Sequence, residues 1–241
     1  MRHSIVMLDL DGTLTDTKED LSEAILQRAV EETGAPENET REVVRTLVGL
    51  PPTELYSGLL RLLGRDPGRM LESDVLSLRS WMNGVTLSLT RLFPEVKEVL
   101  PLLVSSGYKL ILTTNTPAGV VGQRIDRAGL TEYFELLLGV DHLGGVSKSD
   151  HPRLAREYMG LSGPGFAELA VLVGDSAGDM HVAREAGLTA IGRLTGDNGQ
   201  ALLDAGAHHV IRDLRELEPL LRGLDEVPRL DPHAEDPGRP E

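Results

Sequence analysis

From residue 95 onwards the chain alternates short apolar runs with segments of helical periodicity, and this alternation constrains the fold more than any other feature. Each apolar run has the length of a buried strand, and the segments between repeat apolar residues at helical spacing. Parallel strands need such crossover helices, so the order predicts an α/β fold, a doubly wound parallel sheet with helices on both faces. Within 95–105, Pro101 should bend or break the helix. The expected strands are 108–113, 136–140, 170–173, 189–192 and 209–211, and the expected helices include 95–105, 117–128, 152–158 and 180–186.

The first part of the chain has a different pattern. Ile5 to Leu8 are uniformly apolar and predict one more buried strand. The residues that follow contain no convincing strand up to Gly84, which should end the last of several helices at 16–33, 40–48, 52–63 and 67–82. We therefore expect a small all-helical cap domain at 16–84, inserted into a core domain made of 1–15 and 85–223. Residues 224–241 hold four prolines and six acidic residues without periodicity, which predicts a disordered tail.

Composition excludes several classes of function. The formal net charge is -14, and a surface this acidic repels nucleic-acid backbones and anionic lipid headgroups. The sequence contains no cysteine, which excludes disulfides, thiolate metal sites and cysteine nucleophiles. No apolar stretch approaches the roughly 20 residues that a membrane helix needs. We expect a cytoplasmic protein that binds neither nucleic acid nor membrane, and the oligomeric state stays open.

The segment Asp9-Leu10-Asp11-Gly12-Thr13 directly follows the first expected strand, where open α/β sheets place their ligand sites. Side chains two residues apart in extended backbone point the same way, so the carboxylates of Asp9 and Asp11 should converge. They repel each other unless a cation lies between them or one is protonated, which suits a magnesium site or a general acid. Gly12 allows a sharp turn, and Thr13 offers a hydroxyl and an amide, so both are candidates for binding a substrate.

A second acidic segment, Gly174-Asp175-Ser176-Ala177-Gly178-Asp179, follows the expected strand 170–173 and opens a helix. Asp175 at the strand end would meet the metal, and Asp179 would lie near it on one face of the helix. Taken alone, these aspartates fit a helix cap equally well.

Two further segments, a strand end and a loop, carry groups suited to a phosphate. Thr114 and Asn115 end the expected strand 108–113 with a hydroxyl and an amide, although such residues also form ordinary turns. Lys148 precedes a helix and supplies a compact positive charge, which suits a phosphoryl group or a pair of carboxylates. A lone lysine in a loop is usually just solvated.

Together these four segments, in this order and structural context, resemble the haloacid dehalogenase superfamily from about residue 4 to residue 222. The resemblance is to the phosphoglycolate-phosphatase-like branch with a helical cap, through Phe93-Pro94, Thr114-Asn115-x-Pro117 and Gly174-Asp175-Ser176-x-x-Asp179. That family often has a lysine where Thr116 stands and a glycine where Glu95 stands.

The resemblance implies a magnesium-dependent phosphatase acting on a small phosphorylated metabolite. Asp9 would attack phosphorus and form an aspartyl-phosphate. Asp11 would protonate the leaving alcohol and then help to deprotonate the attacking water. Thr114 and Lys148 would complete the catalytic set by binding the phosphoryl group.

The same resemblance supplies a metal site and a substrate-reading residue. Mg²⁺ would be held by Asp9, the backbone carbonyl of Asp11 and Asp175, with Asp179 beside them. A carboxylated substrate such as phosphoglycolate would need a cation from the cap, for which Arg45 is the candidate next to the turn 49–53. A solvated Arg45 without such a role is an equal alternative.

Other functions remain open at this point. A receiver-type signalling module also has an acidic magnesium pocket and an aspartate nucleophile, although the inserted helical block and Asp11 argue against it. A non-catalytic binding relative is weakened because no expected catalytic group is missing. Within the enzymes, a sugar phosphomutase, a pyrophosphatase or a phosphonatase is possible. A phosphonatase needs a lysine early in the cap, and Lys18 is the only lysine between Met1 and Lys97.

Overall fold

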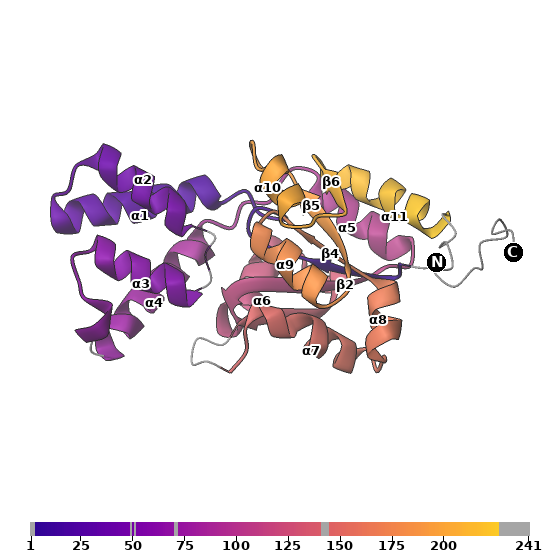
Figure 1. Cartoon of the computed structure of the whole chain (residues 1–241). Coiled ribbons are helices and arrows are strands. Elements are labelled where there is room, and N and C mark those ends of the chain that lie inside the picture. The colour runs from indigo at the N-terminus through magenta and orange to yellow at the C-terminus, as the bar shows by residue number, and fades with distance from the viewer. Residues whose placement is uncertain (1–2, 49, 51, 70–71, 141–144, 227–241) are drawn as a thin grey trace, which may run out of the picture.

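The core of the protein is a six-stranded, fully parallel sheet with the strand order β3-β2-β1-β4-β5-β6 (Figure 1). The computed structural model describes residues 3–48, 50, 52–69, 72–140 and 145–226. The strands are β1 (Ile5–Leu8), β2 (Lys109–Pro117), β3 (Phe134–Val140), β4 (Ala170–Gly174), β5 (Thr189–Arg193) and β6 (His209–Ile211). The predicted α/β fold class is therefore confirmed, because β1 lies at the centre and the chain winds outward to both edges.

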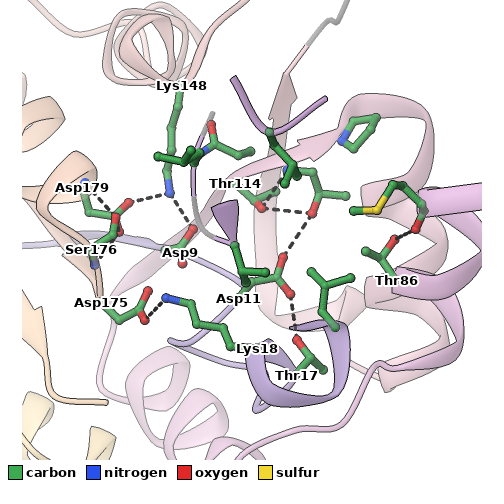
Figure 2. Close-up of a pocket in the computed structure, with 18 of the residues that line it drawn as sticks. Asp9, Asp11, Thr17, Lys18, Thr86, Thr114, Lys148, Asp175, Ser176 and Asp179 are labelled. Atoms are coloured by element: carbon green, nitrogen blue, oxygen red, sulfur yellow. Dashed lines mark hydrogen bonds and ion pairs between the residues drawn. The ribbon is translucent and has the colours of Figure 1, made fainter. Parts of the chain in front are cut away.

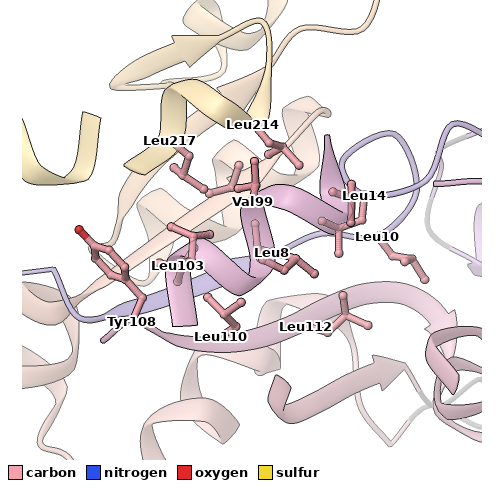
Figure 3. Close-up of a cluster of buried hydrophobic side chains, with 14 of the residues drawn as sticks. Leu8, Leu10, Leu14, Val99, Leu103, Tyr108, Leu110, Leu112, Leu214 and Leu217 are labelled. Carbon is pink, nitrogen blue, oxygen red and sulfur yellow. The ribbon is translucent and has the colours of Figure 1, made fainter. Parts of the chain in front are cut away.

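Helices cover both faces of this sheet, which explains why the central strands are apolar throughout. Alternate residues of β1 enter two separate clusters: Val6 and Leu8 face one, and Ile5 and Met7 face the other. The first cluster packs against α5 (Val96–Ser105) and α11 (Leu217–Glu226), as Figure 3 shows for Leu8, Val99, Leu103 and Leu217. The second packs against α7 (His151–Tyr158), α8 (Gly163–Leu169), α9 (Ala177–Glu185) and α10 (Gly199–Asp204). α6 (Ala118–Ala128) connects β2 to β3 and contributes Val121 and Ile125 to the first cluster.

The helical block between β1 and α5 stands apart from the sheet, beyond one end of its strands (Figure 1). It comprises α1 (Lys18–Thr33), α2 (Glu37–Leu47), α3 (Pro52–Leu62) and α4 (Glu72–Ser88). These helices share their own apolar cluster, which includes Ile25, Val44, Leu60 and Met82. We call this block the cap. Its division from the core at residue 84 stays a prediction, since α4 runs through that position to Ser88.

Two linkers join the cap to the core and lie side by side. The first spans 9–17, and the second spans 89–95. Thr15 and Leu92 form an antiparallel bridge, Asp16 N donates to Arg91 O at 2.8 Å, and Phe93 N donates to Leu14 O at 3.0 Å. The linkers therefore form one connection rather than two independent hinges.

Several local expectations need correction. Pro101 lies inside a continuous helix, α5, and does not break it. Gly84 lies inside α4, where a glycine costs about 1 kcal/mol relative to alanine but does not end a helix that tertiary packing holds. The expected tail at 224–241 begins too early, because α11 continues to Glu226 and Asp225 accepts a hydrogen bond from His3 N at 2.8 Å. Residues 227–241 lie outside the described residues. No helix in the described ranges is long and apolar enough to cross a membrane.

Candidate active site

The polar residues at the carboxyl ends of β1, β2 and β4 meet at one edge of the sheet, facing the cap (Figure 2). Asp9 follows β1, Thr114 lies in β2, and Asp175 follows β4. Their strands are neighbours in the order β2-β1-β4, and parallel strands present their ends on the same side. A cavity of about 120 Å³ opens here between core and cap, lined by these three residues together with Asp11, Asn115 and others.

Three buried carboxylates form the centre of the site. Asp9, Asp175 and Asp179 each offer an oxygen within 4.8 Å of the others. Asp179 is fixed at the start of α9 by a capping box, in which Ser176 N donates to Asp179 Oδ2 at 3.1 Å. Gly12 makes room for the group: its φ of 90° lies in the left-handed region, and a Cβ there would collide with the Asp175 carboxylate.

Two ammonium groups partly neutralise these carboxylates. Lys148 Nζ lies 2.5 Å from both Asp9 Oδ1 and Asp179 Oδ1, and its side chain is buried. Lys18, the first residue of α1, forms an ion pair from the cap side with Asp175 Oδ2. The cluster thus holds three acidic and two basic groups, and Figure 2 shows the two lysines entering it from opposite sides.

The electrostatics favour the binding of a further cation. Burial raises the pKa of Asp9 to about 7, against the opposing effect of Lys148. Burial also raises the pKa of Asp175, although Lys18 opposes it. Burial acts in the same direction on Asp179, but Lys148 and the hydrogen bonds from Ser176 together outweigh it and lower the pKa of that carboxyl. These carboxylates are buried and are not fully neutralised by the two lysines, so some of them stay partly protonated. Such a group is suited to binding a divalent cation that prefers oxygen ligands.

The Asp11 carboxylate does not join this group but points away from Asp9 (Figure 2), and it pairs with Arg124 of α6. Arg124, whose side chain is 1% exposed, donates two hydrogen bonds to it, of 2.6 Å and 2.8 Å. Thr15 and Thr17 donate to Asp11 Oδ1 at 3.0 Å and 3.1 Å. Burial alone would raise the pKa of Asp11, but Arg124 and these hydroxyls lower it to about 2. In this arrangement Asp11 is an ionised carboxylate held away from Asp9.

The loop after Asp9 is held by a second buried ion pair. Arg193 Nη2 lies 2.5 Å from Glu95 Oε1, and Arg193 Nη1 donates to the carbonyl oxygen of Thr13. The guanidinium lies 3.7 Å from the centre of the Phe93 ring. Thr13 Oγ1 in turn donates to Asp9 Oδ2 at 3.4 Å. Glu95, where the resemblance leads one to expect glycine, therefore helps to position the loop that follows Asp9.

Thr114 and Asn115 lie in β2, which extends beyond the expected end at residue 113, and both line the cavity. Thr114 Oγ1 accepts a hydrogen bond from Thr116 N at 3.0 Å. Thr116 Oγ1 donates to Asp11 Oδ2 at 3.3 Å and accepts from Arg124 Nη1 at 3.0 Å. The residue that stands in place of the family's frequent lysine thus belongs to the Asp11 network.

The structure brings most of the predicted site residues together, but not Arg45. The Arg45 side chain is 64% exposed, pairs with Glu42 at 2.8 Å and is absent from the residues that line the cavity. Apart from Lys18, the described cap residues that line the cavity are apolar or neutral, and they include Leu21, Val48, Leu50, Leu55, Tyr56, Met82, Asn83 and Thr86.

Sequence reasoning missed two cations, Arg124 and the role of Lys18 at Asp175. Arg124 shares the buried face of α6 with Val120, Val121 and Ile125. A charged residue on an apolar helical face was the available signal, since such a residue needs a partner. Lys18 gave no comparable signal, because it begins a helix beside acidic residues.

A parallel sheet with aspartates at the ends of neighbouring strands, under a helical cap, defines a capped α/β enzyme of phosphate chemistry. A family model described as haloacid dehalogenase-like hydrolase matches residues 6–192. The chain belongs to this family.

Relatives narrow the class further. A phosphoglycolate phosphatase from Yersinia pestis is 30% identical over 218 residues, covering 90% of this chain and 92% of the relative. One from Pseudomonas putida is 32% identical and covers 89% and 78% of the two chains. The crystal structure of a predicted phosphatase from Clostridium acetobutylicum has the same fold, with a TM-score of 0.74 at 21% identity, covering 92% of this chain and 100% of that one. The protein is a phosphatase, similar to phosphoglycolate phosphatases, which decides against the receiver-type alternative.

Proposed function

We propose that the protein hydrolyses a small phosphomonoester in a Mg²⁺-dependent reaction with Asp9 as nucleophile, and that phosphoglycolate is the first substrate to test. The observation that carries this proposal is the buried group of Asp9, Asp175 and Asp179, which has one positive charge too few. The name of the phosphoglycolate phosphatase relatives supports the choice of substrate.

The residues present fit a magnesium ion. Carboxylate and carbonyl oxygens are the ligands that Mg²⁺ prefers, and no cysteine thiolate competes with them, since the sequence contains no cysteine. Asp9 and Asp175, with the backbone carbonyl of Asp11, would hold the ion, and Asp179 would remain beside them on Lys148. When bound, Mg²⁺ neutralises charge that develops on the oxygens of the transferring phosphoryl group.

The chain's own residues would carry the two chemical steps. In the first, an Asp9 oxygen forms a bond to phosphorus while the bond to the leaving oxygen breaks, and the leaving oxygen takes a proton from Asp11. In the second, Asp11 accepts a proton from a water molecule whose oxygen attacks phosphorus, which frees Asp9 and releases phosphate. Lys148 and Thr114 would hold the phosphoryl oxygens. Asp11 must leave Arg124 to act in either step, because its carboxylate points away from Asp9 in the structure. It must also take up a proton from solvent before the first step, because Arg124 keeps it ionised, and the loss of that contact would allow this by raising its pKa.

The remaining enzyme alternatives differ in what they require. A phosphonatase needs an uncharged lysine amine for a Schiff base, whereas Lys18 is paired with Asp175, and this pairing raises the pKa of Lys18 despite the opposing effect of burial. That pairing favours the phosphatase. A sugar phosphomutase or a pyrophosphatase would use the same core residues, so substrate assays must separate them.

The test is phosphate release from phosphoglycolate, an aryl phosphate, a sugar phosphate and pyrophosphate, each with Mg²⁺ and with excess chelator. We expect phosphomonoester hydrolysis that disappears with chelator and in Asp9→Asn. The exposed Asp126→Asn, the same chemical change on α6, serves as the matched control with parental activity. Turnover that survives chelation would refute the metal requirement, and turnover in Asp9→Asn would refute the covalent step.

A further inference from the structure

The cavity offers very few cations to a substrate. Of the described residues that line it, Lys18 and Lys148 alone carry a positive charge. The cap side presents apolar groups such as Leu21 and Leu55 to the place where the leaving group must lie. Arg45 points outward to Glu42, so it does not supply the missing charge. Among the described residues of the lining, these two lysines are therefore the side chains that can form an ion pair with an anionic leaving group.

The two lysines are held very differently. Lys148 lies between two carboxylates, Asp9 and Asp179, and its side chain is 9% exposed. Lys18 contacts one carboxylate, Asp175, and its side chain is 33% exposed toward the cavity mouth. Lys18 also begins the first cap helix, so it enters the site from the cap, on the side opposite to Lys148 (Figure 2). Its flexible four-carbon stem allows the ammonium to change partners without moving the helix.

We propose that Lys18 has two alternating partners: the Asp175 carboxylate when the metal is absent, and an anionic group on the substrate's leaving alcohol when the metal is bound. A divalent cation that takes Asp175 removes the carboxylate with which Lys18 forms its ion pair, and it repels the Lys18 ammonium. The leaving-group side of the cavity is then the nearest place for this charge. This inference rests on the proposed function and assigns its substrate class.

The substrate class that follows is a small phosphate ester whose leaving alcohol carries a carboxylate. Phosphoglycolate is a compact example. A neutral alkyl or aryl phosphate would still bind through its phosphoryl group but would leave Lys18 without a partner. Lys18 would thus bind the substrate carboxylate and determine specificity, the role for which the sequence suggested Arg45.

The first experiment measures metal binding without substrate. Lys18→Met and the parent are titrated with Mg²⁺ by calorimetry, with Lys109→Met as control, because Lys109 is a surface lysine paired with Glu135 on β3. Removal of a competing ammonium should tighten Mg²⁺ binding by about tenfold or more in Lys18→Met, and Lys109→Met should match the parent. Equal or weaker Mg²⁺ binding in Lys18→Met would overturn the proposal.

The second experiment measures specificity at saturating Mg²⁺. The ratio of kcat/KM for phosphoglycolate to kcat/KM for ethyl phosphate is compared in the parent, Lys18→Met, Lys18→Arg and Arg45→Ala. Loss of one charge-assisted hydrogen bond should lower this ratio by about 10- to 100-fold in Lys18→Met, mainly through KM for phosphoglycolate. Lys18→Arg should recover part of it, and Arg45→Ala should keep the parental ratio.

The outcomes separate the two proposals. A parent that hydrolyses ethyl phosphate but not phosphoglycolate, or a Lys18→Met variant with an unchanged ratio, overturns the role of Lys18 and leaves the phosphatase assignment intact. A parent that hydrolyses no phosphomonoester overturns the proposed function, while the Mg²⁺ titration still decides whether Lys18 competes with the metal.

Discussion

Replacement of Asp9 by asparagine should abolish turnover and also stabilise the metal-free protein at alkaline pH. Asp9 has a pKa of about 7 in the folded chain, raised from 3.8 mainly by burial. One unit of pKa corresponds to about 1.4 kcal/mol, so an ionised Asp9 costs the folded state about 4 kcal/mol at pH 8 relative to the unfolded chain. Asparagine removes that cost. Lys148 loses one of its two partners in exchange, so we expect a net gain of about 2 to 4 kcal/mol.

The pH dependence identifies the cause. Between about pH 4 and pH 7 the folded parent binds more protons at Asp9 than the unfolded chain does. The stability that protonated Asp9 contributes to the folded state is therefore fully present below about pH 4 and is lost as the pH rises through about 7. Urea unfolding with chelator should therefore show little difference between parent and Asp9→Asn at pH 4.5 and a large one at pH 8. Asp126→Asn should follow the parent at both values. A gap of equal size at the two pH values, or no gap, would contradict this account.

Three further predictions concern the groups around the loop that follows Asp9. Arg124→Met should lower the free energy of unfolding by about 1 to 3 kcal/mol, less than for a fully buried pair because the Asp11 side chain is 35% exposed; an unchanged urea midpoint would show that the pair is neutral. Glu95→Ala should lower the free energy of unfolding by about 3 to 5 kcal/mol, because Arg193 is left buried without its carboxylate partner. A double variant that also carries Arg193→Met should lose clearly less free energy than the sum of the two single variants. Losses that simply add would refute the coupling between the two residues. Gly12→Ala should weaken Mg²⁺ binding and lower turnover by about tenfold or more. The added Cβ displaces the Asp175 carboxylate, and a side chain at positive φ costs about 1 to 2 kcal/mol. A variant that binds Mg²⁺ as tightly as the parent would show that Asp175 does not need this space.

Periodicity was enough to predict the strands of the sheet. β1 and β6 match their expected ranges, and the other strands differ by a few residues at their ends. The helix α8 was missed because its seven residues are too few to show a helical repeat, and they contain Gly163, Pro164 and Gly165. Pro101 and Gly84 misled for the opposite reason. Local preference argued against a helix at each, but packing of the surrounding residues decided the outcome.

The candidate site was predictable where it depends on strand ends. Asp9, Thr114 and Asp175 end neighbouring parallel strands, so their convergence follows from the topology alone. Lys148, Lys18 and Arg124 reach the site through long side chains from loops and helices. The partner of such a side chain depends on tertiary packing, and only the resemblance located Lys148. The orientation of Asp11 was also beyond the pattern, because a spacing of two residues fixes the direction of a side chain only while the backbone stays extended, and the chain turns at Gly12.

The network around Asp11 connects the proposed general acid to the position of the cap. Asp11 accepts hydrogen bonds from Thr15 and Thr17 in the first linker, and Arg124, which holds the same carboxylate, also donates to Thr90 Oγ1 in the second linker at 3.5 Å. The two linkers are themselves hydrogen-bonded to each other. A movement of the cap that shifts the linkers must therefore change the contacts that hold Asp11 away from Asp9. Conversely, Asp11 cannot turn toward a substrate without giving up contacts to the first linker and to Arg124. The orientation of the acid and the placement of the cap are in this way parts of one hydrogen-bonded unit, so substitutions in the linkers should alter the chemical steps as well as access to the cavity.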